Sequence, residues 1–382
     1  MKSPININHI SAGFTSVLVG YTSSVIIILQ AATASGANTK QTASWLLALG
    51  IAMGVTSIAY SWRFKTPILT AWSTPGAAML ATQATSYSYE ENIAAFIVSG
   101  LLISLTGLIK PLNRLLTAIS PQIATAMLAA ILLPFCLKAF TPISSNLVTF
   151  LILFVGFFAS KRLIPKYAML ALLVLAIIVS IYSGSFTDAA IELAITSPAW
   201  TIPHFNLQAI INISLPLYII TMLSQNLPGI AMLNSHQYQI KTKPVFIGTG
   251  LMTALLAPFG GFSINLAAIS AAICMNDDVD EDKNQRYKAS MWAGVFYLIA
   301  GLWGATVVKL FLLLPQDVSQ MLAGLALLGT LLMCLQNAFT DEKKREAALL
   351  TFLISLSAVS LAGLSAPIIG LLVGIIYARF SK

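Results

Sequence analysis

Long apolar runs alternate with short polar segments along the whole chain. A helix that crosses a membrane needs roughly 20 mainly apolar residues, and this length divides the sequence into fourteen candidate spans. The candidate spans cover residues 10–34, 43–61, 67–86, 91–109, 119–137, 144–160, 166–183, 207–233, 244–258, 260–275, 287–308, 315–335, 347–361 and 363–379. The pattern therefore predicts an all-α polytopic membrane protein.

The third and tenth candidate spans contain residues that interrupt a helix. Ser73-Thr74 precedes Pro75-Gly76 in the third span, and Gly260-Gly261 opens the tenth. Ser or Thr caps a helix well, and Pro suits its first turn. We therefore expect extended chain over 67–72, followed by a half-helix that begins near Pro75.

The amino termini of two such half-helices define the expected chemistry of the site. In the tenth span we expect Ser263 to cap the second half-helix. Irregular backbone at membrane depth is tolerated only where it is buried in protein or lines a cavity. The two interrupted spans therefore either line a substrate cavity or are kinks packed within the protein. Two amino termini that face each other near the midplane would offer free N–H groups and partial positive charge to an anion.

Three pairs of similar segments indicate an internal repeat. The nine residues from Pro121 match those from Pro315 at five positions, at an offset of 194. Gly107-Leu108 and Gly301-Leu302 have the same offset, whereas the segments that begin at Trp72 and Phe262 are 190 residues apart. The partners are seven spans apart, so the two halves should have opposite orientations, as in the inverted repeats of secondary transporters. We predict a first repeat over 1–183, an external loop over 184–206 and a second repeat over 207–382.

The composition supports a membrane protein and the charges predict its orientation. Of the 382 residues, 57% are hydrophobic and 9% charged, whereas a soluble domain carries about 25% charged residues. With the amino terminus inside, the fourteen-span topology places 18 of the 21 Lys and Arg residues in the cytoplasm. Lys and Arg accumulate on the cytoplasmic side of membrane proteins. The net charge of +8 therefore indicates topology, with both termini cytoplasmic, and not nucleic-acid binding.

Polar residues within the apolar spans are the candidate ligands. Gln225 and Asn226 are adjacent amides in an apolar stretch, which is costly unless both have partners. They line a substrate cavity or hydrogen-bond between helices. For Trp72 and Phe262 there are two expected roles: stacking on an aromatic ligand, or packing within the protein. The candidate substrate-binding residues are Tyr21, Trp72, Ser73, Thr74, Gly76, Gln225, Asn226, Phe262, Ser263 and Asn265.

The same sequence argues against an enzyme. In the predicted topology, all thirteen carboxylates fall in loops or at span ends, and the three cysteines show no metal-ligand spacing. The three histidines also lie at span ends or in loops, where we expect structural or solvated roles. The acidic run 276–288 lacks the ligand spacing of an EF-hand and is interpreted as a solvated loop. We therefore predict no catalytic site, no metal and no cofactor.

Three motifs resemble a known transporter family. They are Thr70-Ala-Trp-Ser-Thr-Pro-Gly-Ala-Ala78, Ser224-Gln-Asn-x-Pro-Gly229 and Met321-Leu-Ala-Gly-Leu-Ala326. They resemble the benzoate/proton symporter (BenE-type) family of bacterial inner membranes, and the likeness extends over essentially the whole chain. That family is similar in fold to the uracil transporter. The resemblance implies fourteen spans as 7+7 inverted repeats, a core domain of spans 1–4 and 8–11, and a gate domain of spans 5–7 and 12–14.

The resemblance also implies a substrate position and a function. In that fold the substrate lies between the ends of spans three and ten, beside a polar residue of span eight that Gln225 matches here. Nucleobase carriers have a carboxylate at that position, and an amide suits an anion better. The resemblance implies a secondary transporter that imports a small aromatic carboxylate such as benzoate by proton symport. The alternative functions are an anion channel and a carrier for another small organic anion or a nucleobase-like substrate. For its assembly, a homodimer is the expected possibility.

Overall fold

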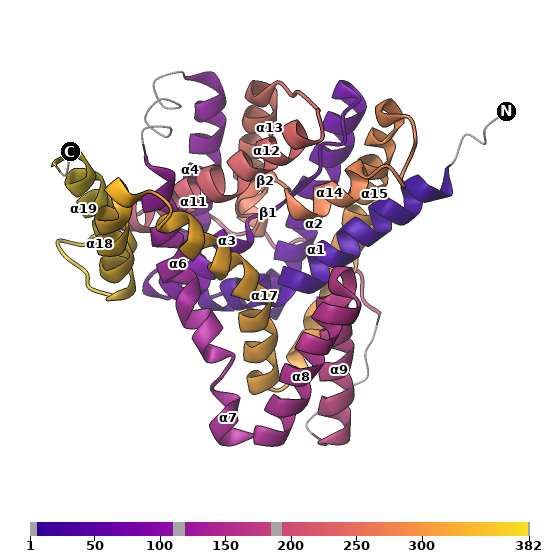
Figure 1. The fold of residues 1–382 in the computed structure, drawn as a ribbon, viewed down its shortest axis with the longest axis horizontal. Helices are drawn as coiled ribbons and strands as arrows, with labels where there is room; N and C mark the ends of the chain where they lie inside the picture. Colours follow the sequence, from indigo (N-terminus) through magenta and orange to yellow (C-terminus); the bar gives the residue numbers. More distant parts are fainter. Residues whose placement is uncertain (1–5, 110–118, 185–192, 381–382) are drawn as a thin grey trace.

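The computed structural model describes residues 6–109, 119–184 and 193–380. The two chain ends, which we predict to be cytoplasmic, lie outside these ranges. So do residues 185–192 of the predicted external loop. The described chain is mostly helical (Figure 1).

The elements of the first half, in chain order, are α1 (Ile7–Ala34), α2 (Thr39–Phe64), β1 (Thr70–Trp72), α3 (Thr74–Gln83), α4 (Tyr89–Leu108), α6 (Pro121–Lys138), α7 (Pro142–Ser145), α8 (Leu147–Leu163) and α9 (Ala168–Tyr182). Those of the second half are α10 (Leu207–Ala209), η3 (Ile210–Ser214), α11 (Leu215–Ile220), η4 (Thr221–Asn226), α12 (Leu227–Ser235), α13 (Thr242–Leu256), β2 (Ile264–Leu266), α14 (Ile269–Met275), α15 (Tyr287–Leu302), α16 (Gly304–Leu312), α17 (Gln316–Ala338), α18 (Arg345–Leu356) and α19 (Ala366–Phe380).

Among the described residues, seven helical stretches are long and apolar enough to cross a membrane by length and composition, or eight if the bent pair 283–302 and 304–312 is one span. One of the seven, Leu207–Ser235, is a helical run that contains the two π-helical segments η3 and η4. The third and tenth predicted spans each contain a strand followed by a short helix, β1 with α3 and β2 with α14, and the remaining ones correspond to shorter helices or to the bent pair. The count of fourteen therefore remains a prediction.

Helices from the two halves pack against each other in pairs. The largest helix contacts between the halves join α2 to α15, α4 to α13 and α6 to α17. Glycines allow the first two pairs to approach closely: a Cβ on Gly50 would lie 2.7 Å from the Cα of Gly301, and one on Gly100 would lie 2.7 Å from the carbonyl oxygen of Gly250. Such close backbone contact is typical of helix packing in membranes. In Figure 1, α8 and α9 form one pair and α18 and α19 another, both at the periphery.

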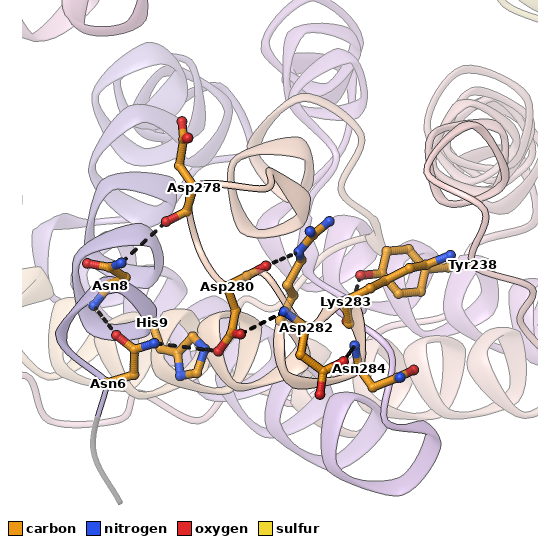
Figure 2. Close-up of polar contacts among 10 residues, drawn as sticks. Asn6, Asn8, His9, Tyr238, Asp278, Asp280, Asp282, Lys283 and Asn284 are labelled. Carbon is orange, nitrogen blue, oxygen red and sulfur yellow. Dashed lines mark hydrogen bonds and ion pairs between the residues drawn. The ribbon is translucent and has the colours of Figure 1, made fainter. Parts of the chain in front are cut away.

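The loop between α14 and α15 is fastened to the start of α1 (Figure 2). The Nε2 of His9 lies 2.9 Å from the Oδ2 of Asp280, and the amide of Asn8 donates to the carbonyl of Asp278. Arg286 is buried and donates from Nε and Nη1 to the carbonyls of Asp280 and Met275. His9 therefore has the structural role, whereas several acidic side chains of this loop remain exposed as predicted.

Candidate functional site

Two extended segments from opposite halves of the chain meet in a short antiparallel ribbon. β1 pairs with β2 so that Thr70 lies opposite Leu266, Ala71 opposite Asn265 and Trp72 opposite Ile264. The pairing continues beyond the strands, because the N–H of Ser73 donates to the carbonyl of Ser263 at 3.0 Å. A bilayer offers no water to satisfy backbone groups. Each segment therefore provides the hydrogen bonds that the other lacks.

Ser73 caps α3, as the sequence predicts. Its Oγ accepts a 3.1 Å hydrogen bond from the N–H of Gly76, and its carbonyl accepts one from Ala77. Pro75 has no N–H. Within the described residues the N–H of Thr74 has no protein partner. The amino terminus of α3 therefore offers one free backbone donor together with the positive end of the helix dipole.

The prediction that Ser263 caps the second half-helix is wrong. Ser263 precedes β2, and α14 begins only at Ile269, without a capping side chain. The alignment at an offset of 190 caused the error: β1 begins at Thr70 and β2 at Ile264, an interval of 194 residues. At that interval the counterpart of Ser73 is Ala267, which has no side chain that can cap.

The two adjacent amides of η4 have different environments. Asn226 is fully buried, and its Oδ1 accepts a 2.9 Å hydrogen bond from the N–H of Leu266 in β2. Asn226 therefore has a structural hydrogen-bonding role, but its partner is the strand β2 and not another helix. Gln225 is half-buried, and its amide donates to the neighbouring Ser224 carbonyl. Gln225 is therefore the amide that remains available to a ligand. π-Helical segments such as η4 are frequent at functional sites.

The predicted aromatic residues are packed in the protein. The ring of Trp72 lies 4.9 Å from that of Tyr21, and its Nε1 donates to the Oγ of Ser24. Phe262 is fully buried against the rings of Trp45 and Phe96. Of the two roles expected from the sequence, Trp72 and Phe262 therefore have the packing role in this conformation.

Gly76 and Asn265 occupy crowded positions beside the ribbon. A Cβ on Gly76 would lie 2.7 Å from the Cδ1 of Leu217, so α3 packs tightly against α11. The Nδ2 of Asn265 donates to the carbonyl of Leu266. Thr74 is half-buried at the start of α3.

Several buried polar atoms around the ribbon have no partner among the described residues. These atoms are the hydroxyls of Tyr21, Thr221 and Ser263 and the Oδ1 of Asn265. They belong to α1, η4, β2 and the segment before β2, and the helices of this group contact the ribbon or its half-helices. Buried polar groups are normally satisfied, so orphans need an explanation. Three of the four are hydroxyl donors that a small anion can use.

An apolar cavity of about 40 Å³ lies between α6 and the α11–η4 run. Its lining is Pro121, Ala124, Thr125, Met127, Leu128, Ile219, Ile220, Leu223, Ser224 and Leu227. None of the ten predicted site residues lines this cavity, although Ser224 adjoins Gln225. A space of this size holds a few water molecules and no aromatic ligand. Two sequence features mark the walls of this cavity: the repeated Pro121-Gln122 motif and the Ser224-Gln225-Asn226 run. Only the tertiary packing shows that these two segments lie side by side.

Comparisons with known proteins agree with one another. Residues 3–380 match the family model described as benzoate membrane transport protein. The chain is 39% identical to the inner membrane protein YdcO of Escherichia coli, covering 95% of this chain and 93% of the relative. It is 34% identical to the benzoate membrane transport protein of Acinetobacter baylyi, covering 98% and 95%.

Among solved structures, the transmembrane domain of a cyanobacterial bicarbonate transporter, BicA, is similar in fold, with a TM-score of 0.64, 15% identity and coverage of 99% of this chain and 98% of that chain. The structure of SLC26A9 has a TM-score of 0.62 at 13% identity, covering 98% of this chain and 65% of the other. The predicted likeness to the uracil transporter remains a prediction. The match over nearly the whole length shows that the chain belongs to the benzoate membrane transport protein family, whose members are membrane transporters and not enzymes.

Proposed function

We propose that the protein is a secondary transporter that imports a small aromatic carboxylate, with benzoate as the first candidate, by proton symport. Family membership supports the substrate class. The observation that carries the proposal is the uncharged donor set beside the ribbon, which consists of the free Thr74 N–H and the unpartnered hydroxyls of Tyr21, Thr221 and Ser263. Such a set suits an anion that must be held and then released.

The carboxylate would bind at the amino terminus of α3. There it receives hydrogen bonds from the Thr74 N–H and nearby hydroxyls, and the helix dipole favours its charge. A hydrogen bond to a charged group contributes roughly 1.5–3 kcal/mol. A few such bonds hold the anion without a buried Lys or Arg, whose full charge would slow release.

The aromatic ring would extend from this point toward the apolar cavity between α6 and η4. Ile219, Leu223 and Leu128 give that cavity a lining that suits a hydrocarbon ring. Its present volume of about 40 Å³ is too small, because ligand sites commonly measure about 300–1,000 Å³. Binding therefore requires α6 to separate from the α11–η4 run.

This motion fits a two-domain transporter. We propose a core domain of spans 1–4 and 8–11, a gate domain of spans 5–7 and 12–14, and fourteen spans in two inverted repeats. The pairing of α2 with α15 and of α6 with α17 supports this plan, as does the 194-residue interval between the strands. We place both termini in the cytoplasm of a bacterial inner membrane on the predicted charge distribution.

The proton has no carboxylate to carry it at mid-membrane depth in this topology. We propose that it travels on the substrate carboxylate. The substrate would bind as the anion at the amino terminus of α3 and cross the membrane with a proton on its carboxylate, which would couple uptake to the pH gradient without a titrating side chain.

The test is uptake into proteoliposomes with an imposed pH gradient. The panel contains radiolabelled benzoate, a second aromatic acid, bicarbonate and uracil. We expect benzoate to accumulate above its external concentration when the outside is acidic, and to equilibrate when the gradient is collapsed. Control liposomes without protein measure passive entry of benzoic acid. Uptake that never exceeds equilibrium would indicate a channel, and preference for uracil or bicarbonate would overturn the substrate assignment.

A further inference from the structure

Residues 193–206, which we call the strap, run as extended chain without helix or strand across the ends of several helices. The strap connects the two halves and is bonded through its backbone. The N–H of Thr196 donates to the carbonyl of Leu302, and the N–H of Thr201 donates to that of Pro258, both at 2.9 Å. The strap is therefore fixed to the end of α15 and to the turn that follows α13.

Further bonds fix the strap to α2 and α4. The N–H of Ala199 donates to the Oγ of Ser44 at 2.9 Å, and the N–H of His204 donates to the carbonyl of Glu90 at 3.0 Å. The Oγ1 of Thr196 accepts from the N–H of Ala305. These contacts join the strap to α2, α4, α15, α16 and the turn after α13.

The side chains of the strap have an orientation that is unusual for a protein in water. Thr196 and Thr201 point inward and are buried. The large apolar side chains point outward, with exposed fractions between 58% and 76%, at Leu193, Ile195, Trp200, Ile202 and Phe205. Polar-in and apolar-out is the arrangement that a membrane protein presents to lipid, because an exposed apolar patch of this kind is unfavourable in water.

The exposed apolar surface continues from the strap onto the helices that hold it. Leu255 and Leu251 on α13, below the Pro258 contact, are exposed, as are Ile299 and Leu302 on α15. Trp200 packs edge-on against Phe259 at 5.1 Å, and Trp is enriched at membrane interfaces. We propose that the strap, which is part of the external loop that the sequence predicts over 184–206, lies in the interfacial layer of the bilayer, where its outward side chains contact lipid.

Matched probe positions on the strap test this proposal. Single cysteines at Ile195 and Ile202 report on the outward apolar face, and one at Ser197, which is exposed and polar, serves as the control. The three native cysteines, Cys136, Cys274 and Cys334, are buried and are replaced by alanine. Each variant is labelled with an environment-sensitive fluorophore in nanodiscs that contain or lack lipids with a quencher on the acyl chain.

We expect the lipid quencher to reduce fluorescence at positions 195 and 202 at least threefold more than at 197, and iodide in the buffer to show the opposite order. Equal quenching by iodide at 202 and 197 would overturn the proposal. Protection from both quenchers together with cross-linking between copies would also overturn it, because the strap would then face a second copy. Neither result depends on the identity of the transported substrate.

Discussion

The helices of the proposed core domain and those of the proposed gate domain, which we call the braced body and the second body, are held together by different contacts. The braced body, α1–α4 with α10–α16, is bonded at its surface by the strap and by the loop 276–286 (Figure 2). It also has buried bonds inside, such as that from the Oγ of Ser16 to the carbonyl of Ser270 at 2.6 Å. The second body, α6–α9 with α17–α19, has hydrogen bonds between its helices that, among the described residues, involve exposed or half-buried side chains such as Ser145 and Asp317.

This difference indicates where the protein can move. Buried hydrogen bonds fix geometry, because breaking one leaves an unsatisfied polar group. Apolar packing between helices in lipid has no hydrophobic driving force, since lipid is equally apolar. The bodies meet where α3 and η4 contact α6, where α1 contacts α9 and α17, and where Asn212 of η3 hydrogen-bonds to Gly363 and Ser365 in the segment between α18 and α19. The small apolar cavity lies at the contact between η4 and α6. We therefore expect the braced body to move as a unit against the second.

A cross-link between the bodies should have the largest effect. Thr125 of α6 and Ser224 of η4 line opposite sides of the cavity. Cysteines at both positions, joined by a short bifunctional reagent, should abolish uptake because the cavity can no longer widen. Each single-cysteine variant treated with the same reagent is the control. Full uptake after mass spectrometry has verified the cross-link would contradict motion at this interface.

Charge beside the ribbon should have the next largest effect. Gln225→Ala removes one donor and should weaken benzoate binding about ten- to a hundredfold, which corresponds to a bond of roughly 1.5–3 kcal/mol to a charged group. Gln225→Glu should be worse, because like charges in a low dielectric repel strongly. The measurement is the benzoate affinity of each purified, monodisperse variant and of the parent. If Gln225→Glu binds a carboxylate as well as the parent does, the anion lies elsewhere.

The cap of α3 should matter more for stability than for binding. Ser73→Ala removes a capping bond worth about 1 kcal/mol, but it also frees the Gly76 N–H as a new donor to the anion. We expect a lower unfolding midpoint with less than a tenfold loss of affinity. Ser88→Ala, which removes the equivalent cap of α4, should lower the midpoint and leave affinity unchanged. A loss above a hundredfold in Ser73→Ala alone would instead show that the hydroxyl contacts the substrate.

Sequence reasoning was correct where the chemistry is local. Ser73 caps α3 because its own side chain reaches the N–H of Gly76, three residues further along the chain. It was wrong for Ser263, because the pairing of β2 with β1 determines where the strand ends and α14 begins. The role of Asn226 likewise depends on Leu266, 40 residues away. The cavity depends on the packing of α6 against η4, which no local pattern encodes.

The smallest expected effect concerns the loop of the braced body, and it depends on pH. Asp280 has a side chain that is 13% exposed. Its partial burial raises its pKa, but hydrogen bonds from the Asp282 N–H, from His9 and from Asn6 outweigh this effect and hold the pKa below its usual range. A carboxylate whose pKa is lowered by folding stabilises the folded state above its unfolded pKa of about 3.9, and this contribution is lost as pH falls through the folded pKa.

Asp280→Asn should therefore lower the unfolding midpoint at pH 7 by about 2 °C, with a shrinking difference from the parent below about pH 4. Asp278→Asn is the matched control, because Asp278 contributes its backbone carbonyl and not its carboxylate to the contact with Asn8. Thermal unfolding of purified protein at pH 7 and pH 3 measures both variants. Because the carboxylate braces α14 against α1 and not against the second body, the uptake rate at neutral pH should stay within about twofold of the parent. A loss of uptake without a loss of stability would mean that this loop takes part in the motion, and the boundary between the two bodies would have to be redrawn.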